Sequence, residues 1–293
     1  MNRRVRHVLQ ATAAVGALTL AASVVVVAGS LAAAASPPPA GSGALTSARF
    51  VAAQSASALQ SVAHRGDKQF HPDNSVAGIA SAVAKGADWI EIDVHYNPSG
   101  DTFFLSHDNG CSGPGGSATI DTAAYATVVA RCALPELDDV LAMFGAQGYT
   151  SFVIEFKATS RTRATGAVAL VDLIQAAGVE DDVWISSLND TALANVQATG
   201  TSALLMRVRS NSGFIKVSDA YLRETANLGY DGVNVNIWAW NRAKADYAES
   251  LGLVSVGWAW PTAGESTNTS AIELDLDMYM TDRLDDLHAK LGR

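Results

Sequence analysis

The chain has 293 residues, of which 48% are hydrophobic and 17% are charged, so it can form one large domain with a substantial core. Its formal net charge of −9 at pH 7 argues against nucleic acid as a partner, because surfaces that bind nucleic acid carry excess positive charge. The same charge opposes contact with anionic membranes, so we expect membrane contact only through an uncleaved N-terminal segment or a lipid substrate.

The N-terminal segment has the composition of an export signal. Three arginines occupy the first six positions, and residues 11–35 form an apolar run rich in small side chains. This pattern predicts a signal peptide over residues 1–35, cut between residues 33 and 36, and therefore a secreted, extracellular protein. Because the run is long for a signal peptide, retention as a single membrane anchor stays open. Residues 36–60 are predicted to be a linker and lead-in to a folded domain over residues 61–293.

The rest of the chain alternates apolar strand patterns with helical patterns. The predicted strands are 62–65, 89–95, 152–157, 183–187, 203–208, 232–237, 254–260 and 278–281, and helical patterns include 75–85, 163–177, 189–199, 218–228 and 242–251. Eight such units predict an α/β fold of the TIM (β/α)8 barrel type, with the short strand 102–106 left over as a hairpin insertion after the second strand. Functional groups of a TIM barrel come from the C-terminal ends of its strands.

Two carboxylates share one face of the second predicted strand. Because side chains alternate faces along a strand, Glu91 and Asp93 project together while Ile92 faces the other way. Converging like charges repel unless a cation or a proton separates them, and oxygen ligands favour Mg²⁺ or Ca²⁺ over zinc. Glu155, on the next strand, could complete a metal site. The alternatives are a solvated acidic face and an ordinary charge pair between Glu155 and Lys157.

Two histidines and two cations accompany these acids. His64 and His107 flank the acidic strand and could act as general base and general acid, because imidazole exchanges protons near neutral pH. Arg65 offers a planar donor fork that matches phosphate oxygens, and Lys157 offers a second positive charge near a strand end. Trp258 lies near the predicted barrel mouth, where it could contact a quaternary head group; filling the core is the alternative for the late tryptophans.

The only cysteines are Cys111 and Cys132, 21 residues apart. In an exported chain an even count favours a disulfide, although two buried thiols are the alternative. The bridge would close the loop that follows His107 and would contribute about 3 kcal/mol in the chain-entropy model.

Taken in order, these motifs resemble the glycerophosphodiester phosphodiesterase family, a TIM-barrel type of phosphodiesterase similar to phospholipase C. The motifs that carry the resemblance are His-Arg-Gly at 64–66, Pro-Asp-Asn-Ser at 72–75, Gly-Ala-Asp-Trp-Ile-Glu-Ile-Asp-Val at 86–94, His-Asp at 107–108, Ile-Glu-Phe-Lys at 154–157 and Thr-Asp at 281–282. The resemblance implies one divalent metal ion, Mg²⁺ or Ca²⁺, on Glu91, Asp93 and Glu155. It also implies that His64 and His107 are catalytic and that Arg65 and Lys157 bind phosphate.

The chain departs from the family pattern in two places. Pro-Asp-Asn-Ser replaces the usual Pro-Glu-Asn-Thr, which keeps an acid and a hydroxyl. Residues 109–116 are rich in glycine where the family usually has a polar stretch with an arginine, a change that bears on substrate choice and not on the metal ligands or the two histidines.

Three functions are compatible with these residues. The resemblance favours a secreted hydrolase that releases glycerol 3-phosphate and an alcohol from small glycerophosphodiesters. An alternative is a phospholipase D of the sphingomyelinase type, which would act on intact lipids by intramolecular transphosphatidylation. The third is a glycoside hydrolase using Glu91 and Glu155, or a catalytically silent binding protein, on the same scaffold.

Overall fold

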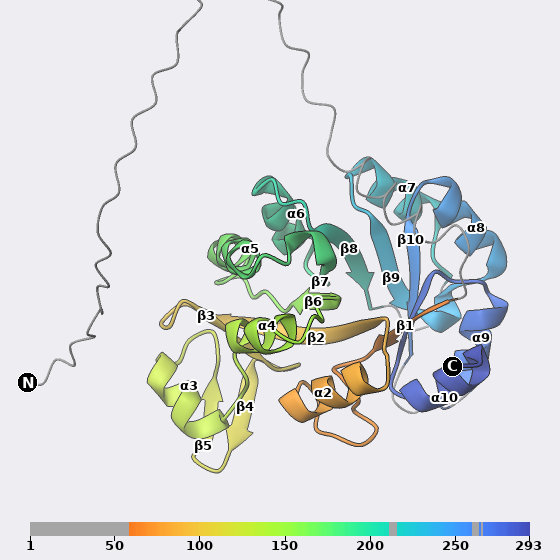
Figure 1. The fold of residues 1–293 in the computed structure, drawn as a ribbon. Coiled ribbons are helices and arrows are strands. Elements are labelled where there is room, and N and C mark those ends of the chain that lie inside the picture. Colours follow the sequence, from red (N-terminus) through yellow and green to blue (C-terminus); the bar gives the residue numbers. More distant parts are fainter. Residues whose placement is uncertain (1–58, 211–215, 260–263, 265) are drawn as a thin grey trace, which may run out of the picture. The chain divides into compact units, whose positions relative to one another are not determined.

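The structure is a computed structural model that describes residues 59–210, 216–259, 264 and 266–293. Its centre is a ring of eight parallel strands in which β1 pairs with both β2 and β11, so the sheet closes on itself (Figure 1). Around the ring the strands are β1 (Gln60–Ala63), β2 (Trp89–Asn97), β6 (Phe152–Phe156), β7 (Val183–Ser187), β8 (Leu204–Arg209), β9 (Gly232–Asn236), β10 (Val254–Trp258) and β11 (Met278–Thr281). The predicted TIM barrel is confirmed.

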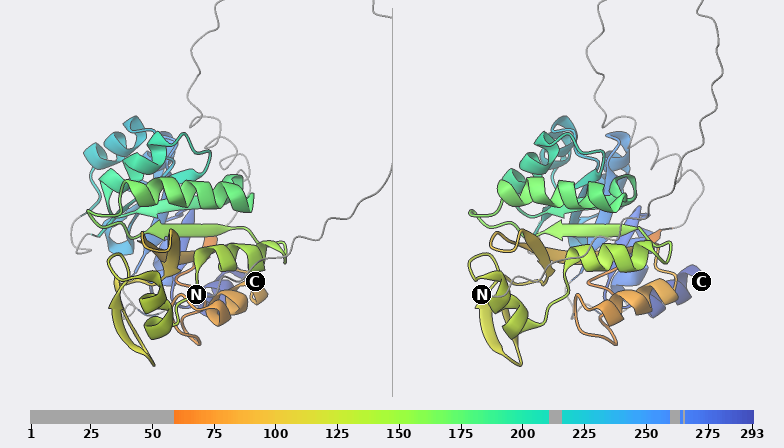
Figure 2. Two further views of the ribbon diagram at one scale, coloured as in Figure 1. Left: turned by 90° about the vertical axis from the view of Figure 1, so that its left-hand side faces the viewer. Right: turned by 60° about the vertical axis from the view of Figure 1, so that its left-hand side comes forward.

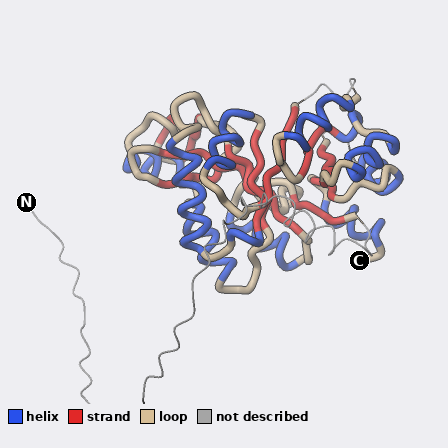
Figure 3. The backbone as a smooth tube through the Cα atoms, turned by 90° about the horizontal axis from the view of Figure 1, so that it is seen from above, coloured by secondary structure: helices blue, strands red, loops and turns tan. Residues whose placement is uncertain are grey.

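Helices cover the outside of this ring, as the view from above shows (Figure 3). They are α2 (Val76–Ala84), α4 (Leu137–Gly145), α5 (Thr165–Ala177), α6 (Asp190–Ala198), α7 (Asp219–Asn227), α8 (Arg242–Ser250), α9 (Ser266–Glu273) and α10 (Leu284–Leu291), with short 3-10 turns η1 (Glu180–Asp182) and η2 (Ile237–Ala239). Several begin at a polar cap: the side chains of Ser75, Asn189, Ser218 and Asn241 each accept a hydrogen bond from a backbone N–H in the first turn. These caps set where the chain turns into a helix after leaving the barrel mouth.

Apolar and polar side chains occupy different positions along the barrel strands. On β2, Ile90, Ile92 and Val94 face outward into the larger core between sheet and helices. Inside the ring, a second apolar cluster includes Trp184 and Met278 and fills the lower barrel. The polar residues Glu91 and Asp93 of β2 and Glu155 of β6 lie on the inner face of the barrel outside this apolar cluster.

An insertion follows β2. Strand β3 (Thr102–Leu105) pairs antiparallel with β2, and a separate hairpin of β4 (Gly110–Gly113) and β5 (Gly116–Thr119) precedes α3 (Tyr125–Cys132); both views of Figure 2 show this unit at one side of the barrel. Cys111 and Cys132 form the predicted disulfide and pack with Phe104, Ile120 and Val128. The predicted hairpin insertion is confirmed, because the strand predicted at 102–106 is β3 and pairs with β2; the separate β4–β5 hairpin and α3 were not predicted.

Some predictions fall on other parts of the chain. The signal peptide or anchor over residues 1–35, and most of the lead-in over 36–60, lie outside the described residues, as does the last residue of the strand predicted over 254–260. Among the described residues, no helix has both the length and the apolar character needed to cross a bilayer.

Candidate active site

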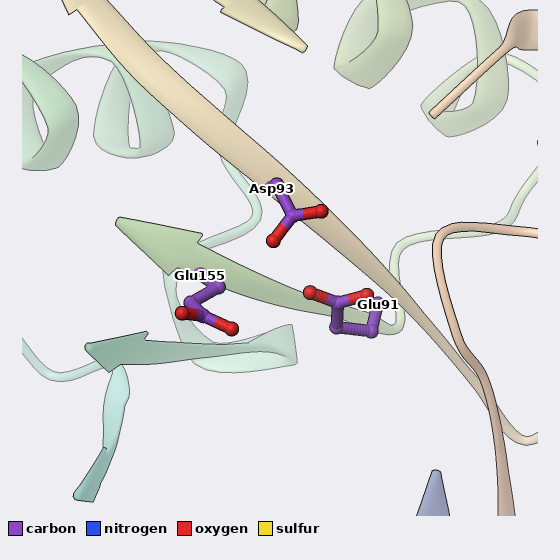
Figure 4. Close-up of side chains that lie close together, drawn as sticks. All are labelled: Glu91, Asp93 and Glu155. Carbon is purple, nitrogen blue, oxygen red and sulfur yellow. The ribbon is translucent and has the colours of Figure 1, made fainter. Parts of the chain in front are cut away.

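The three predicted metal ligands meet at the barrel mouth. Glu91 and Asp93 lie on β2, Glu155 lies on the neighbouring β6, and Asp93 and Glu155 are register partners. One ligand oxygen from each acid lies within 4.8 Å of the others, and the carboxylates point toward one another (Figure 4). Glu91 is 0% exposed and Asp93 is 1% exposed, so the alternative of a solvated acidic face is wrong.

The buried acids have different proton affinities. Burial raises the pKa of Glu91 well above its usual value, and the neighbouring charges of Asp93 and Glu155 add to the effect. Burial alone would also raise the pKa of Asp93, but Lys157 and Arg65 outweigh it and lower that pKa to about 2. Lys157 Nζ lies 3.0 Å from Asp93 Oδ1 and 2.6 Å from Glu155 Oε1, so the predicted charge pair with Glu155 forms within the acidic cluster.

The acidic cluster fits a hard divalent cation. Glu91 Oε2 accepts a hydrogen bond from the backbone N–H of Arg65 at 2.9 Å, but Glu91 Oε1 is buried without a hydrogen-bond partner among the described residues. An orphaned carboxylate oxygen in a wholly carboxylate donor set matches the ligands that Mg²⁺ and Ca²⁺ prefer. Glu91, Asp93 and Glu155 are therefore the residues that could hold such an ion.

A tight turn after β1 brings Arg65 onto the acids. Arg65 and Gly66 adopt φ of 59° and 82°, and a Cβ on Gly66 would lie 2.8 Å from the backbone carbon of Gly78, so only glycine fits there. The Arg65 guanidinium contacts Asp93 through Nε at 3.2 Å and Asp73 through Nη1 at 2.9 Å. Burial opposes the charge of Arg65, but these carboxylates raise its pKa.

Asn74 fixes the orientation of Asp93, a role that the sequence analysis missed. Its Nδ2 donates to Asp93 Oδ2 at 2.9 Å, and its Oδ1 accepts from the backbone N–H of Asp93 at 2.9 Å. Asn74 was part of the family-like motif, but motif membership alone did not indicate this pair of bonds.

His64 is held by a carboxylate from the other end of the chain. Its Nδ1 lies 2.5 Å from Asp282 Oδ1, and its Nε2 lies 4.0 Å from Glu91 Oε2. Burial opposes ionisation of Asp282, but the contacts with His64 and Lys68 lower its pKa. The sequence analysis gave Asp282 no role. Closure of the barrel could have indicated this contact. Ala63 on β1 pairs with Thr281 on β11, so the residues that follow them, His64 and Asp282, lie side by side.

His107 follows β3 and is more open, with 43% of its side chain exposed. Its Nδ1 lies 2.9 Å from Asp108 Oδ1. The loop after it is tied to the barrel by Asp121, which accepts from Asn109 at 2.8 Å and from Thr159 at 2.9 Å. Sequence reasoning did not find this link, which lies between two loops distant in sequence.

Six of the predicted functional side chains line one pocket of about 250 Å³. Its lining includes the candidate acid–base pair, the candidate phosphate ligands, one of the three acids and the predicted head-group contact: His64, Arg65, His107, Glu155, Lys157 and Trp258. The structure thus brings together residues from the ends of four strands, β1, β3, β6 and β10, of which three belong to the barrel.

The chain is similar in sequence and in fold to known phosphodiesterases. A family model for the glycerophosphoryl diester phosphodiesterase family matches residues 64–285. Solved structures of similar fold include a glycerophosphodiester phosphodiesterase from Parabacteroides distasonis (19% identity, 80% of this chain and 97% of that one, TM-score 0.66). Another is the enzyme from Agrobacterium tumefaciens (18% identity, 80% and 100% of the chains, TM-score 0.63). No curated protein matches the sequence.

A third similar structure is a phosphodiesterase from Oleispira antarctica in complex with the product sn-glycerol-3-phosphate (19% identity, 80% of this chain and 97% of that one, TM-score 0.69). Fold and matched sequence together define a phosphodiesterase built on a TIM barrel. The chain belongs to the glycerophosphoryl diester phosphodiesterase family, as its motifs predicted.

Proposed function

We propose that the protein hydrolyses glycerophosphodiesters to glycerol 3-phosphate and an alcohol, and that it needs one divalent cation, Mg²⁺ or Ca²⁺. The observation that carries this proposal is the single pocket in which two histidines and two cationic side chains stand beside a buried carboxylate cluster. The product bound to the Oleispira antarctica phosphodiesterase supports the same substrate class.

In this proposal the cationic side chains bind phosphate and the histidines transfer protons. Arg65 and Lys157 bind the phosphate oxygens and stabilise the charge that they gain in the transition state. His64 and His107 form the acid–base pair, one removing a proton from the nucleophile and the other protonating the leaving alkoxide. The nucleophile is water, or a hydroxyl of the substrate itself with a cyclic phosphate formed first. A bound divalent cation supplies further positive charge to the phosphate.

Asp282 sets the state of His64 in this scheme. Because Asp282 Oδ1 lies 2.5 Å from Nδ1 of His64, a proton on Nδ1 is held there and Nε2 faces the buried acids and the pocket. Nε2 is thus the atom that exchanges a proton with substrate.

The surface around the pocket bears on the choice between small diesters and intact lipids. The pocket itself, of about 250 Å³, would take the phosphate and a small group attached to it in either case. The phospholipase D alternative is favoured only by α3 of the insertion, where Val129 is 45% exposed. The β4–β5 hairpin itself is Gly and Ser, which offers little apolar surface to a lipid.

We also propose that the protein is secreted or anchored outside the cell by its N-terminal segment. The arginine-led apolar run over residues 1–35 supports export, and the Cys111–Cys132 disulfide suits an oxidising compartment.

Substrate profiling tests the function. The purified protein is incubated with glycerophosphocholine, glycerophosphoethanolamine or sphingomyelin, with and without a chelator, and the products are identified by phosphorus NMR. We expect glycerol 3-phosphate from the first two and no turnover in chelator. Turnover of sphingomyelin alone would move the assignment to the phospholipase D type.

Variants test the acid–base pair. His64→Asn and His107→Asn should abolish turnover while leaving the protein folded, as circular dichroism would show. His71→Asn is the matched control, because His71 is a histidine of the β1–α2 loop that does not line the pocket. Full activity in a variant lacking both pocket histidines would overturn the assignment.

A further inference from the structure

One wall of the pocket has no role in the proposed chemistry. In the closed ring, β9 lies opposite the acidic strand β2, with the same number of strands between them in either direction. The pocket lining on this side is mainly apolar, with Leu188, Val208, Trp258 and Met280. Asn234 of β9 is the buried polar side chain among them, with 2% of its surface exposed.

Asn234 carries an unsatisfied acceptor. Its Oδ1 is buried and has no hydrogen-bond partner in the described part of the chain. Asn236, two residues later on the same face, has a structural role, because its Oδ1 accepts from the backbone N–H of Trp238 and starts η2. A buried acceptor without a partner costs free energy, and an aliphatic residue would suit this apolar wall better. The cost is recovered if a ligand in the pocket donates to Asn234.

The surroundings indicate which donor this is. A phosphate oxygen cannot donate to Oδ1 unless it is protonated, so the phosphoryl group is a poor partner. An ammonium group would lose its hydration against an apolar wall that offers a single neutral acceptor. The carboxylate of the pocket lining, Glu155, would not compensate for this loss, because it is already paired with Lys157. A neutral hydroxyl needs only one acceptor and leaves its carbon skeleton against Val208 and Met280.

We propose that Asn234 Oδ1 accepts a hydrogen bond from a hydroxyl of the substrate's glycerol moiety and so determines specificity for that moiety. This inference rests on the proposed function and extends it to the residue that distinguishes glycerol from a shorter or deoxygenated group. The phosphate lies between the two walls, with its charge toward Arg65 and Lys157 and its glycerol toward β9.

Paired substrates test the inference. The wild-type protein and Asn234→Leu are compared on a glycerophosphodiester and on two analogues, each lacking one of the two free glycerol hydroxyls. We expect the wild-type kcat/KM to fall about 5- to 150-fold for the analogue that lacks the hydroxyl read by Asn234. In Asn234→Leu, which keeps the side-chain size but removes the acceptor, this preference should shrink to about twofold or less.

Two further variants separate recognition from packing. Asn234→Asp keeps an acceptor oxygen, so its rate should fall by charge repulsion while its preference for the hydroxylated substrate remains. Met280→Leu changes the same wall without touching a hydrogen bond and should also keep the preference. Because each preference is a ratio within one variant, general damage to the fold cancels.

The outcomes are separable. A preference in Asn234→Leu equal to that of the wild type, or equal losses on all three substrates, would overturn the role of Asn234. Equal losses would instead indicate a contact with the phosphate. A wild-type protein that turns over no glycerophosphodiester would overturn the proposed function itself.

Discussion

Lys157 stabilises the metal-free protein because it neutralises the carboxylate cluster. Its Nζ contacts Asp93 at 3.0 Å and Glu155 at 2.6 Å, and only 13% of its side chain is exposed. Removing one partner of a buried ion pair costs about 3–5 kcal/mol, because the remaining charge is left uncompensated. Arg65 stays 3.2 Å from Asp93, so we expect the lower end for Lys157→Met, about 3 kcal/mol. For a domain of this size that corresponds to a loss of about 6–12 °C in Tm.

The assay is thermal unfolding in a chelator, followed by circular dichroism. Lys244→Met is the control, because Lys244 pairs with Asp219 on the surface and such pairs contribute about 0–1 kcal/mol. Adding Mg²⁺ or Ca²⁺ should raise the Tm of Lys157→Met more than that of the wild type, since the ion supplies the missing positive charge. Equal Tm values for Lys157→Met and the wild type in chelator would refute the charge argument.

Further measurements address the other parts of the site. Asp282→Asn should lower kcat by about 100-fold or more with little change in KM, because His64 loses its orienting charge; an unchanged kcat would remove Asp282 from the mechanism. Replacing Cys111 and Cys132 by serine should reduce the free energy of unfolding in urea by about 3 kcal/mol, and an unaltered midpoint would contradict this. Burial raises the pKa of Glu91, so metal binding should expel its proton and tighten as pH rises; identical calorimetric heats in buffers of different ionisation enthalpy would speak against it.

The barrel could be predicted from sequence because buried parallel strands are short apolar runs between turn residues. The strands predicted at 183–187 and 278–281 coincide with β7 and β11. The β4–β5 hairpin could not be predicted, because both strands consist of glycine, serine and other small residues without an apolar alternation. Those strands are stabilised instead by the disulfide and by packing against Phe104, which are tertiary contacts.

The site, like the fold, could be predicted only in part from the sequence. Period-two alternation placed Glu91 beside Asp93, and neighbouring parallel strands placed Glu155 next to them. The partners of the histidines depended on contacts that no local pattern encodes. Asp282 reaches His64 only when the barrel closes, and the tie from Asp121 to Thr159 joins two loops.

The pairing of His64 with Asp282 spans 218 residues, from the residue after the first strand of the ring to the residue after the last. A ribosome that has made residues 1–277 has already supplied all three acids and both pocket histidines, yet β11 is missing and the sheet still has two open edges. The Asp282 contact to His64 therefore forms only when the first and last strands of the barrel have met. A fragment that ends before β11 would carry every predicted metal ligand but would lack the carboxylate that contacts His64.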